Sequence, residues 1–278
     1  MAVPVDATSR PRPAVTEATH AGAVRASADA LAARAARAGL EARVPTCPRW
    51  RVANLVAHQG MVHRWAASNL RQDGERIPSM SEILRVVPPA ELLDWFSAGV
   101  EELLSALTTA DADVRAMVFL RDAPAPRAFW ARRQAHETTV HATDALAAVL
   151  DRLPRADEVD VDPLLALDGV DELLAGFVTR GRSRFCEVAA PVRLAVVPDD
   201  APAPDDDGPL AWVLDVTEDA ITTRRTTPDD ACAAADAVFR GTPAQLYLGL
   251  WNRGDEVVEE GERGLLPAWA QSVRISWS

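Results

Sequence analysis

The segment 132–144, RRQAHETTVHATD, places histidine, glutamate and aspartate at helical spacing. Residues four apart share one face of an α-helix, so Glu137 and His141 can bind one metal ion together. Asp144 lies on the same side and can accept the second N–H of that imidazole. Arg133, four residues before the glutamate, completes the face. The spacing predicts two metal ligands with two supporting residues, although an ordinary charged helix face has the same pattern.

A third ligand has to come from another segment, because two ligands do not make a stable catalytic metal site. His136 does not qualify, since it lies roughly 100° around the helix from Glu137. His20 lies beside an alanine-rich face, and His63 points to a different side of its helix from His58. His58 sits among apolar residues, where a buried imidazole needs a partner. His58 is therefore the predicted third ligand, with a hydrogen-bonded core histidine as the alternative.

Both candidate segments fall on predicted amphipathic helices. Apolar residues recur at helical spacing in the first half of the chain, at residues 15–40, from 46 onward to 65, at 89–107 and at 126–150. Thr46 or Cys47 can cap the second of these helices, with Pro48 as its first helical residue. Four amphipathic helices predict a bundle, and the core of a bundle is a common place for a metal site.

The composition is that of a globular protein. With 278 residues, 48% of them hydrophobic and 25% charged, the chain can bury a full-sized core. A net charge of -12 argues against duplex nucleic acid and anionic membranes as partners, because both attract basic surfaces. The N-terminus lacks the apolar core of a signal peptide, and the 3 cysteines are scattered, so we expect a cytoplasmic protein in a reducing compartment.

The sequence pattern changes after Asp151. Residues 153–177 are first acidic and then helical. The segments PVRLAVVP, LAWVLDVT and AITTRR alternate between apolar and polar residues and predict strands. Beyond them we expect helices at 231–239 and 243–253, a strand in EVVEEG and a last helix in LLPAWAQSVR. This half predicts a small α+β domain.

These patterns predict a two-domain organisation. We expect a flexible tail at 1–13, a helical metal-binding domain at 14–152, a helical connection at 153–184 and an α+β domain at 185–278. The sequence contains no internal repeat.

Two motifs in the helical half resemble those of the mycothiol-dependent maleylpyruvate isomerase family. VPTCPRWRVANLVAHQGMVHRWA is similar to the family segment P-x-C-P-x-W-x-V-x-x-L-x-x-H, and FWARRQAHETTVHATDA to its signature W-x-x-R-x-x-H-E-x-x-x-H-x-x-D-A. GTPAQLYLGLWNRGDEVVEEG resembles the C-terminal domain of the family, which is similar to sterol carrier proteins. The resemblance runs from about Glu17 to Trp269.

The resemblance implies an α plus α/β two-domain fold, with a DinB-like four-helix bundle followed by a small α+β sterol-carrier-like domain. It implies a divalent metal, usually zinc, on His58, Glu137 and His141, which is the set that the spacing selects. It also implies a catalytic arginine from the C-terminal domain, and Arg253 in LWNRG is the matching position. The alternative for this arginine is a helix-terminal residue that complements the helix dipole.

The resemblance further implies mycothiol, the low-molecular-weight thiol of actinobacteria, as cosubstrate. A metal-activated thiol would then add to a small electrophilic substrate, by S-transfer or cis–trans isomerisation. The expected partners are this thiol and the electrophile, and the expected assembly is a monomer or weak homo-oligomer. Two alternatives stay open: a non-catalytic small-molecule or lipid-binding protein, and a metal-dependent hydrolase that uses water.

Overall fold

The computed structural model describes residues 9–202, 208–261 and 264–275. The chain forms two compact units. Residues 16–119 and 123–154 make up the helical unit, and the mixed-sheet unit contains the described parts of 1–15, 120–122 and 155–278. The tail, domain and connection bounds expected from the sequence stay predictions, because compactness alone does not show which parts fold independently.

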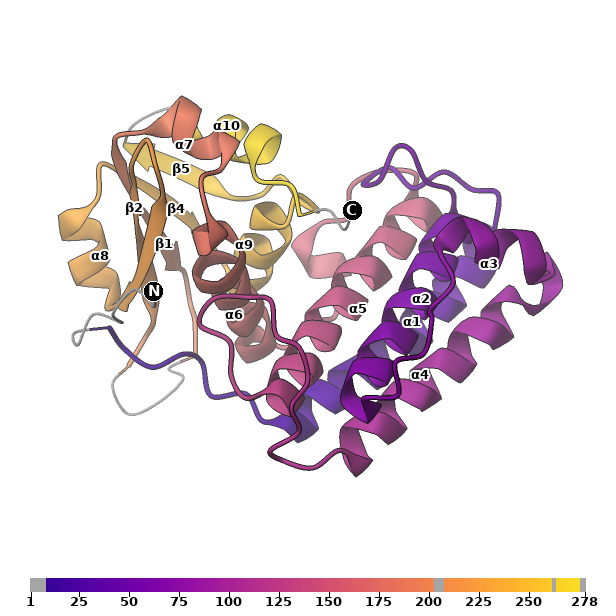
Figure 1. Ribbon diagram of the computed structural model, residues 1–278. Helices are drawn as coiled ribbons and strands as arrows, with labels where there is room; N and C mark the ends of the chain where they lie inside the picture. The colour runs from indigo at the N-terminus through magenta and orange to yellow at the C-terminus, as the bar shows by residue number, and fades with distance from the viewer. Residues whose placement is uncertain (1–8, 203–207, 262–263, 276–278) are drawn as a thin grey trace. The chain divides into compact units, whose positions relative to one another are not determined.

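Four long helices build the helical unit and run side by side in Figure 1. They are α1 (Glu17–Ala38), α2 (Val52–Arg71), α4 (Leu92–Thr109) and α5 (Pro126–Leu150). A short α3 (Met80–Val86) and a 3₁₀ turn, η1 (Pro89–Glu91), connect α2 to α4. Helix α1 packs on α5, α2 packs on α4, and α2 also packs on α5. This last contact brings together the two helices that carry the predicted ligands.

Local signals explain where most of these helices begin and end. Thr16 caps α1 by accepting from the backbone N–H of Thr19. Pro126 is the first residue of α5, where its missing N–H costs nothing, and Asp151 ends the helix in a left-handed conformation. The predicted start of the second helix at Pro48 is wrong, because residues 46–49 form turns and α2 begins only at Val52. The sequence analysis also missed α3.

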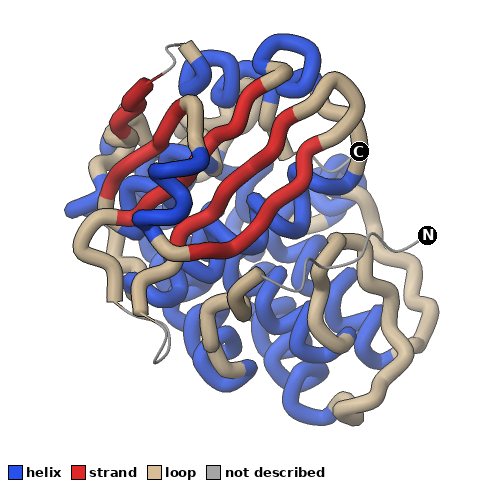
Figure 2. The backbone as a smooth tube through the Cα atoms, turned by 90° about the vertical axis from the view of Figure 1, so that its left-hand side faces the viewer, coloured by secondary structure: helices blue, strands red, loops and turns tan. Residues whose placement is uncertain are grey.

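The mixed-sheet unit contains one five-stranded sheet, whose strands lie side by side in Figure 2. Its strands are β1 (Val192–Pro198), β2 (Ala211–Val216), β3 (Ile221–Thr226), β4 (Ala237–Gly241) and β5 (Val258–Gly261), in the order β3-β2-β1-β4-β5. Only the β1–β4 pair is parallel. The helical elements are α6 (Pro163–Asp171), the π-helical η3 (Glu172–Phe177), η4 (Val178–Arg180), α7 (Arg184–Ala189), α8 (Pro228–Ala234), α9 (Pro243–Leu250) and α10 (Leu265–Ser272), and a short η2 (Ala156–Glu158) precedes them.

Alternate residues of the central strands face opposite sides of the sheet. On one side, small apolar residues of β1 and β2 pack against Ala231 of α8. On the other side, the indole Nε1 of Trp212 donates to Asp171 Oδ1 at 2.8 Å, and Asp171 also pairs with Arg225 of β3. This buried carboxylate joins α6 to the sheet with two partners.

The predicted fold class is confirmed, since a helical bundle is followed by a small mixed sheet with helices. The helix predicted at 231–239 is partly wrong, because α8 ends at Ala234 and residues 237–241 form β4. The alanine-rich run favours a helix locally, but Ala237 and its followers pair with β1 across about forty residues of chain. No helix in the described ranges is long and apolar enough to span a bilayer.

Glycine at position 60 is required by the packing of α2 on α4. A Cβ at Gly60 would collide with the ring of Trp95, over which the Arg64 guanidinium lies at 4.0 Å.

We predict that Gly60→Ala destabilises the protein by about 1–3 kcal/mol through overpacking, as measured by urea unfolding. Gly22→Ala is the matched control, because outside the local backbone of α1 no atom of the described residues lies within 4 Å of its Cβ position. This change should stabilise α1 by up to about 1 kcal/mol. Equal effects of the two changes would contradict this account of the packing.

Candidate metal centre

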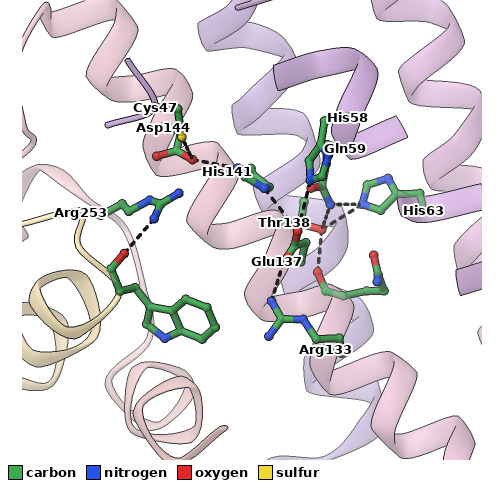
Figure 3. Close-up of polar contacts among 12 residues, drawn as sticks. Cys47, His58, Gln59, His63, Arg133, Glu137, Thr138, His141, Asp144 and Arg253 are labelled. Carbon is green, nitrogen blue, oxygen red and sulfur yellow. Dashed lines mark hydrogen bonds and ion pairs between the residues drawn. The ribbon is translucent and has the colours of Figure 1, made fainter. Parts of the chain in front are cut away.

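Three buried side chains from α2 and α5 converge in the helical unit. One ligand atom each of His58, Glu137 and His141 lies within 4.8 Å of the other two. Glu137 Oε1 is shared, at 3.5 Å from His58 Nε2 and 3.3 Å from His141 Nε2. Figure 3 shows the carboxylate between the two imidazoles. The structure thus brings together the three residues that the sequence selected.

These spacings fit a tetrahedrally coordinated ion. Zinc bonds to nitrogen and oxygen are about 2.0–2.2 Å long, so neighbouring ligands of a tetrahedral site stand about 3.3–3.6 Å apart. Both distances to Glu137 Oε1 fall in that range. Two imidazoles and one carboxylate also leave a coordination position for a further ligand, as in catalytic zinc sites. The donor set and its spacing are therefore suited to a divalent ion such as zinc.

Two further charged residues hold the α5 ligands in place. Asp144 Oδ2 lies 2.8 Å from His141 Nδ1, so the Nε2 atom of the same ring points to Glu137. Arg133 Nη2 donates to Glu137 Oε2 at 2.7 Å, which leaves Oε1 for the imidazoles. Such outer contacts fix the tautomer and orientation of metal-binding groups. The positions of Asp144 and Arg133 are those expected from their spacing on the helix.

The surroundings shift the pKa values of His141, His58 and Glu137 in different directions. Burial disfavours the charged form of His141, but its hydrogen bonds to Asp144 and Glu137 prevail and raise its pKa to about 9. Burial dominates for His58 and lowers its pKa. Burial also opposes the charge of Glu137, yet Arg133 and the two imidazoles hold its pKa well below the usual value. Glu137 is therefore a carboxylate anion at neutral pH.

A second buried polar group lies next to the ligands and ties α2 to α5. Thr138 Oγ1 donates to the Gln134 carbonyl at 2.6 Å and accepts from Gln59 Nε2 at 3.1 Å. His63 Nε2 lies 2.9 Å from the same oxygen and 2.8 Å from Gln59 Nε2. Gln59 follows His58 in sequence and Thr138 follows Glu137, so this network sets the register in which the ligands meet. This network was not predicted from the sequence.

The loop before α2 reaches the site with two side chains that were not predicted to do so. The Trp50 ring centroid lies 4.9 Å from that of His58 and 5.9 Å from that of His141. Cys47 Sγ lies 3.6 Å from Asp144 Oδ2. Cys47 is thus not the capping residue expected from the sequence, because residues 47–51 are not helical. The cysteine and the tryptophan in PTCPRW were the sequence features from which this contact of the loop with the site could have been predicted.

The other histidines of the helical unit and the predicted arginine have their own surroundings. The ring of His136 lies 6.0 Å from that of His20, away from the shared carboxylate. Arg253 belongs to the mixed-sheet unit and follows α9. Its backbone N–H donates to the Leu248 carbonyl at 2.7 Å, and its Nη1 donates to the Trp251 carbonyl at 2.8 Å. The catalytic role of Arg253 stays a prediction.

Fold and site together define a class of protein in which a four-helix bundle with a buried two-histidine, one-carboxylate set precedes a small mixed-sheet unit. Residues 21–146 match the family model described as mycothiol maleylpyruvate isomerase N-terminal domain. The match covers less than half of the chain, and it shows that the helical unit is similar to this N-terminal domain. No curated protein sequence matches the chain significantly.

Two solved structures share the fold. One is a crystal structure of the mycothiol-dependent maleylpyruvate isomerase, with 13% sequence identity and a TM-score of 0.58. The other is a histidine-to-alanine mutant of the mycothiol-dependent maleylpyruvate isomerase, with 12% identity and a TM-score of 0.57. Each match covers 90% of this chain and 95% of the other. At this identity the likeness establishes the architecture of the chain.

The polar network that ties α2 to α5 can be tested with an isosteric change. Thr138→Val removes the hydroxyl and leaves the buried amide group of Gln59 without its acceptor on α5, which should cost about 1–3 kcal/mol in urea unfolding with EDTA present. Thr138→Ser should retain most of the stability. Thr143→Val is the matched control, because within the described part of the chain that buried hydroxyl bonds only to the Thr139 carbonyl. A loss at position 138 no larger than at position 143 would refute the network.

His63 should make the protein sensitive to acid. Burial lowers its pKa to about 3, so the folded protein keeps the ring neutral while the unfolded chain binds a proton below pH of about 6.5. Stability is therefore lost as pH falls from about 6.5 toward 3, by up to about 1.4 kcal/mol per pH unit. We predict a shallower pH slope for His63→Gln than for wild type, in urea unfolding between pH 7 and 5 with EDTA present. Identical slopes would show that His63 does not titrate as described.

Proposed function

We propose that the protein is a divalent-metal enzyme, with zinc as the natural ion, that activates a small thiol for reaction with an electrophilic substrate. The observation that carries the proposal is the shared Glu137 carboxylate, at 3.5 and 3.3 Å from the Nε2 atoms of His58 and His141. These are the separations of neighbouring ligands around a tetrahedral ion. A purely structural zinc usually takes four protein ligands, whereas this set supplies three.

The thiol that we propose is mycothiol. The family model and both similar structures carry mycothiol in their descriptions. A free thiol with a pKa of about 8.5 is only about 3% thiolate at neutral pH. A divalent ion deprotonates a coordinated thiol outright, which supplies up to about 30-fold more nucleophile.

The residues of the chain have distinct proposed roles. His58, Glu137 and His141 would hold the ion, which would supply a binding position for the thiol sulfur. Asp144 would hold the Nδ1 proton of His141, so that an ion could replace the proton on Nε2 and leave the ring in the tautomer that coordinates through Nε2. Arg133 compensates the buried charge of Glu137 without occupying Oε1. These contacts keep the ligands in one geometry, so little reorganisation accompanies binding.

The reaction itself follows two possible courses from the same thiolate. The thiolate sulfur would add to one carbon of a C=C bond conjugated to a carbonyl, and the π electron pair of that bond would move onto the carbonyl oxygen as an enolate. The proton that the thiol gave up would then convert the enolate to the S-transfer product. Alternatively, the enolate would rotate about the former C=C bond, which is now single, and re-form the double bond by expelling the thiolate, which gives the cis–trans isomer. Arg253 is the residue that we propose for binding a carboxylate of a reactant, because a guanidinium can make two parallel hydrogen bonds to it. The carbonyl of Trp251 orients that guanidinium.

Metal analysis combined with turnover tests the proposal. We expect EDTA-treated wild type to regain one equivalent of zinc and to turn over an electrophile such as maleylpyruvate only when mycothiol is present. His141→Ala should lower the zinc affinity by more than about 100-fold, because even outer contacts are typically worth about 10–100-fold. His136→Gln is the matched control on the same helix and should keep the metal, since its ring lies beside His20.

The alternatives give different results in the same experiment. Turnover that is unaffected by omitting the thiol would indicate a hydrolase that uses water, and would contradict the thiol-dependent reaction. A wild-type protein that binds no divalent metal would leave only a binding protein and would overturn the metal centre. Loss of metal in His136→Gln but not in His141→Ala would move the centre away from the proposed ligands.

A further inference from the structure

The two imidazoles of the candidate metal centre are held in different ways. Asp144 fixes the His141 ring through its Nδ1 atom at 2.8 Å. For His58, the hydrogen bonding within the described ranges involves only Nε2 and Glu137, at 3.5 Å. Rotation of an imidazole about its Cβ–Cγ bond moves Nε2 away from its partner, so a ring without a second anchor needs another constraint. The ring of His58 therefore needs a constraint other than a hydrogen bond at Nδ1.

Trp50 supplies a packing contact at this place. Its ring centroid lies 4.9 Å from that of His58, with the planes tilted by 49°, which is within the range of aromatic contacts. The same indole lies 5.9 Å from the His141 ring, and the two imidazoles stand nearly perpendicular to one another at 5.1 Å. The indole thus contacts both imidazoles and restricts their rotation together.

The loop that carries Trp50 is fixed by its own backbone. The Trp50 N–H donates to the Cys47 carbonyl at 2.7 Å, and the Val44 N–H donates to the Trp50 carbonyl at 3.2 Å. Just beyond the loop, the Val52 N–H donates to the Ala42 carbonyl at 3.0 Å. These bonds fix the backbone on both sides of Trp50. The indole therefore extends toward the imidazoles from a defined position of the chain.

Trp50 differs in its ring neighbours from Trp65 and Trp130 of the bundle. Trp65 and Trp130 pack against one another and against the ring of Phe119. Trp50 is half-buried, and its ring neighbours are the imidazoles of two proposed ligands. A half-buried aromatic ring against two metal-binding rings is placed to orient them and to keep water from them.

We propose that Trp50 is a positioning residue of the metal centre, which orients His58 by packing as Asp144 orients His141 by hydrogen bonding. The inference rests on the proposed function, because it requires that His58 and His141 bind the ion. It adds a residue from outside α2 and α5 to the parts that determine metal affinity. A flat aromatic side chain at position 50 is sufficient for this role, since contact and not a hydrogen bond carries it.

Substitutions at Trp50 test the inference through metal binding and not through activity. Zinc affinity is measured by competition with a chromophoric chelator, and coordination geometry by the visible absorption of the Co²⁺-loaded protein. Trp50→Ala should weaken zinc binding by about 10-fold, the scale of an outer contact, and should change the Co²⁺ bands. Trp50→Phe should restore affinity to within about threefold of wild type, because it keeps an aromatic face. Trp95→Phe is the matched control, since that ring packs on Arg64 and Gly60.

The outcomes separate this inference from the proposed function. Wild-type zinc affinity and an unchanged Co²⁺ spectrum in a folded Trp50→Ala variant would overturn the role of Trp50 and leave the metal centre intact. Absence of zinc from the wild type would overturn the metal centre itself. Thermal unfolding of the metal-free variants shows whether each variant folds. If Trp50→Ala does not fold, Trp50→Phe provides the test. A zinc affinity of Trp50→Phe as low as that of His141→Ala would contradict the packing role.

Discussion

One carboxylate, Glu137, is the group on which the rest of the site depends. It is buried, it contacts both imidazoles through Oε1, and it is balanced by Arg133 through Oε2. A buried carboxylate without partners is costly, so its charge has to be met by an arginine and either protonated imidazole or a metal ion. That requirement constrains α2 and α5 to one register, because the two imidazoles come from different helices.

The surrounding structure meets this constraint at several levels. The fully buried network of Thr138, Gln59 and His63 fixes the register one residue away from the ligands. The absence of a side chain at Gly60 allows close packing of α2 on α4 on the opposite side of the ligand helix. The loop before α2 adds Trp50 and Cys47.

Much of this arrangement could be predicted from the sequence, and the exceptions have physical reasons. The α5 bounds and the pairing of Glu137 with His141 follow from local rules, namely proline at the first helical position and four-residue spacing. The position of His58 beside Glu137 follows from the cost of an unpartnered buried imidazole, and its role as a ligand stays a prediction. Trp50 was missed because Pro48 mimics a helix start, so that the loop was assigned to a helix. Strand β4 was missed because parallel pairing with β1 is a long-range interaction that overrides local helix preference.

X-ray absorption spectroscopy of the zinc-loaded protein tests the central claim most directly. We expect nitrogen and oxygen scatterers at about 2.0–2.2 Å with the outer signals of two imidazoles and no sulfur, followed by one sulfur at about 2.3 Å after addition of mycothiol. A sulfur neighbour before the thiol is added would assign Cys47 as a ligand. Zinc without imidazole scattering, or without a new sulfur after addition of the thiol, would contradict the proposed centre.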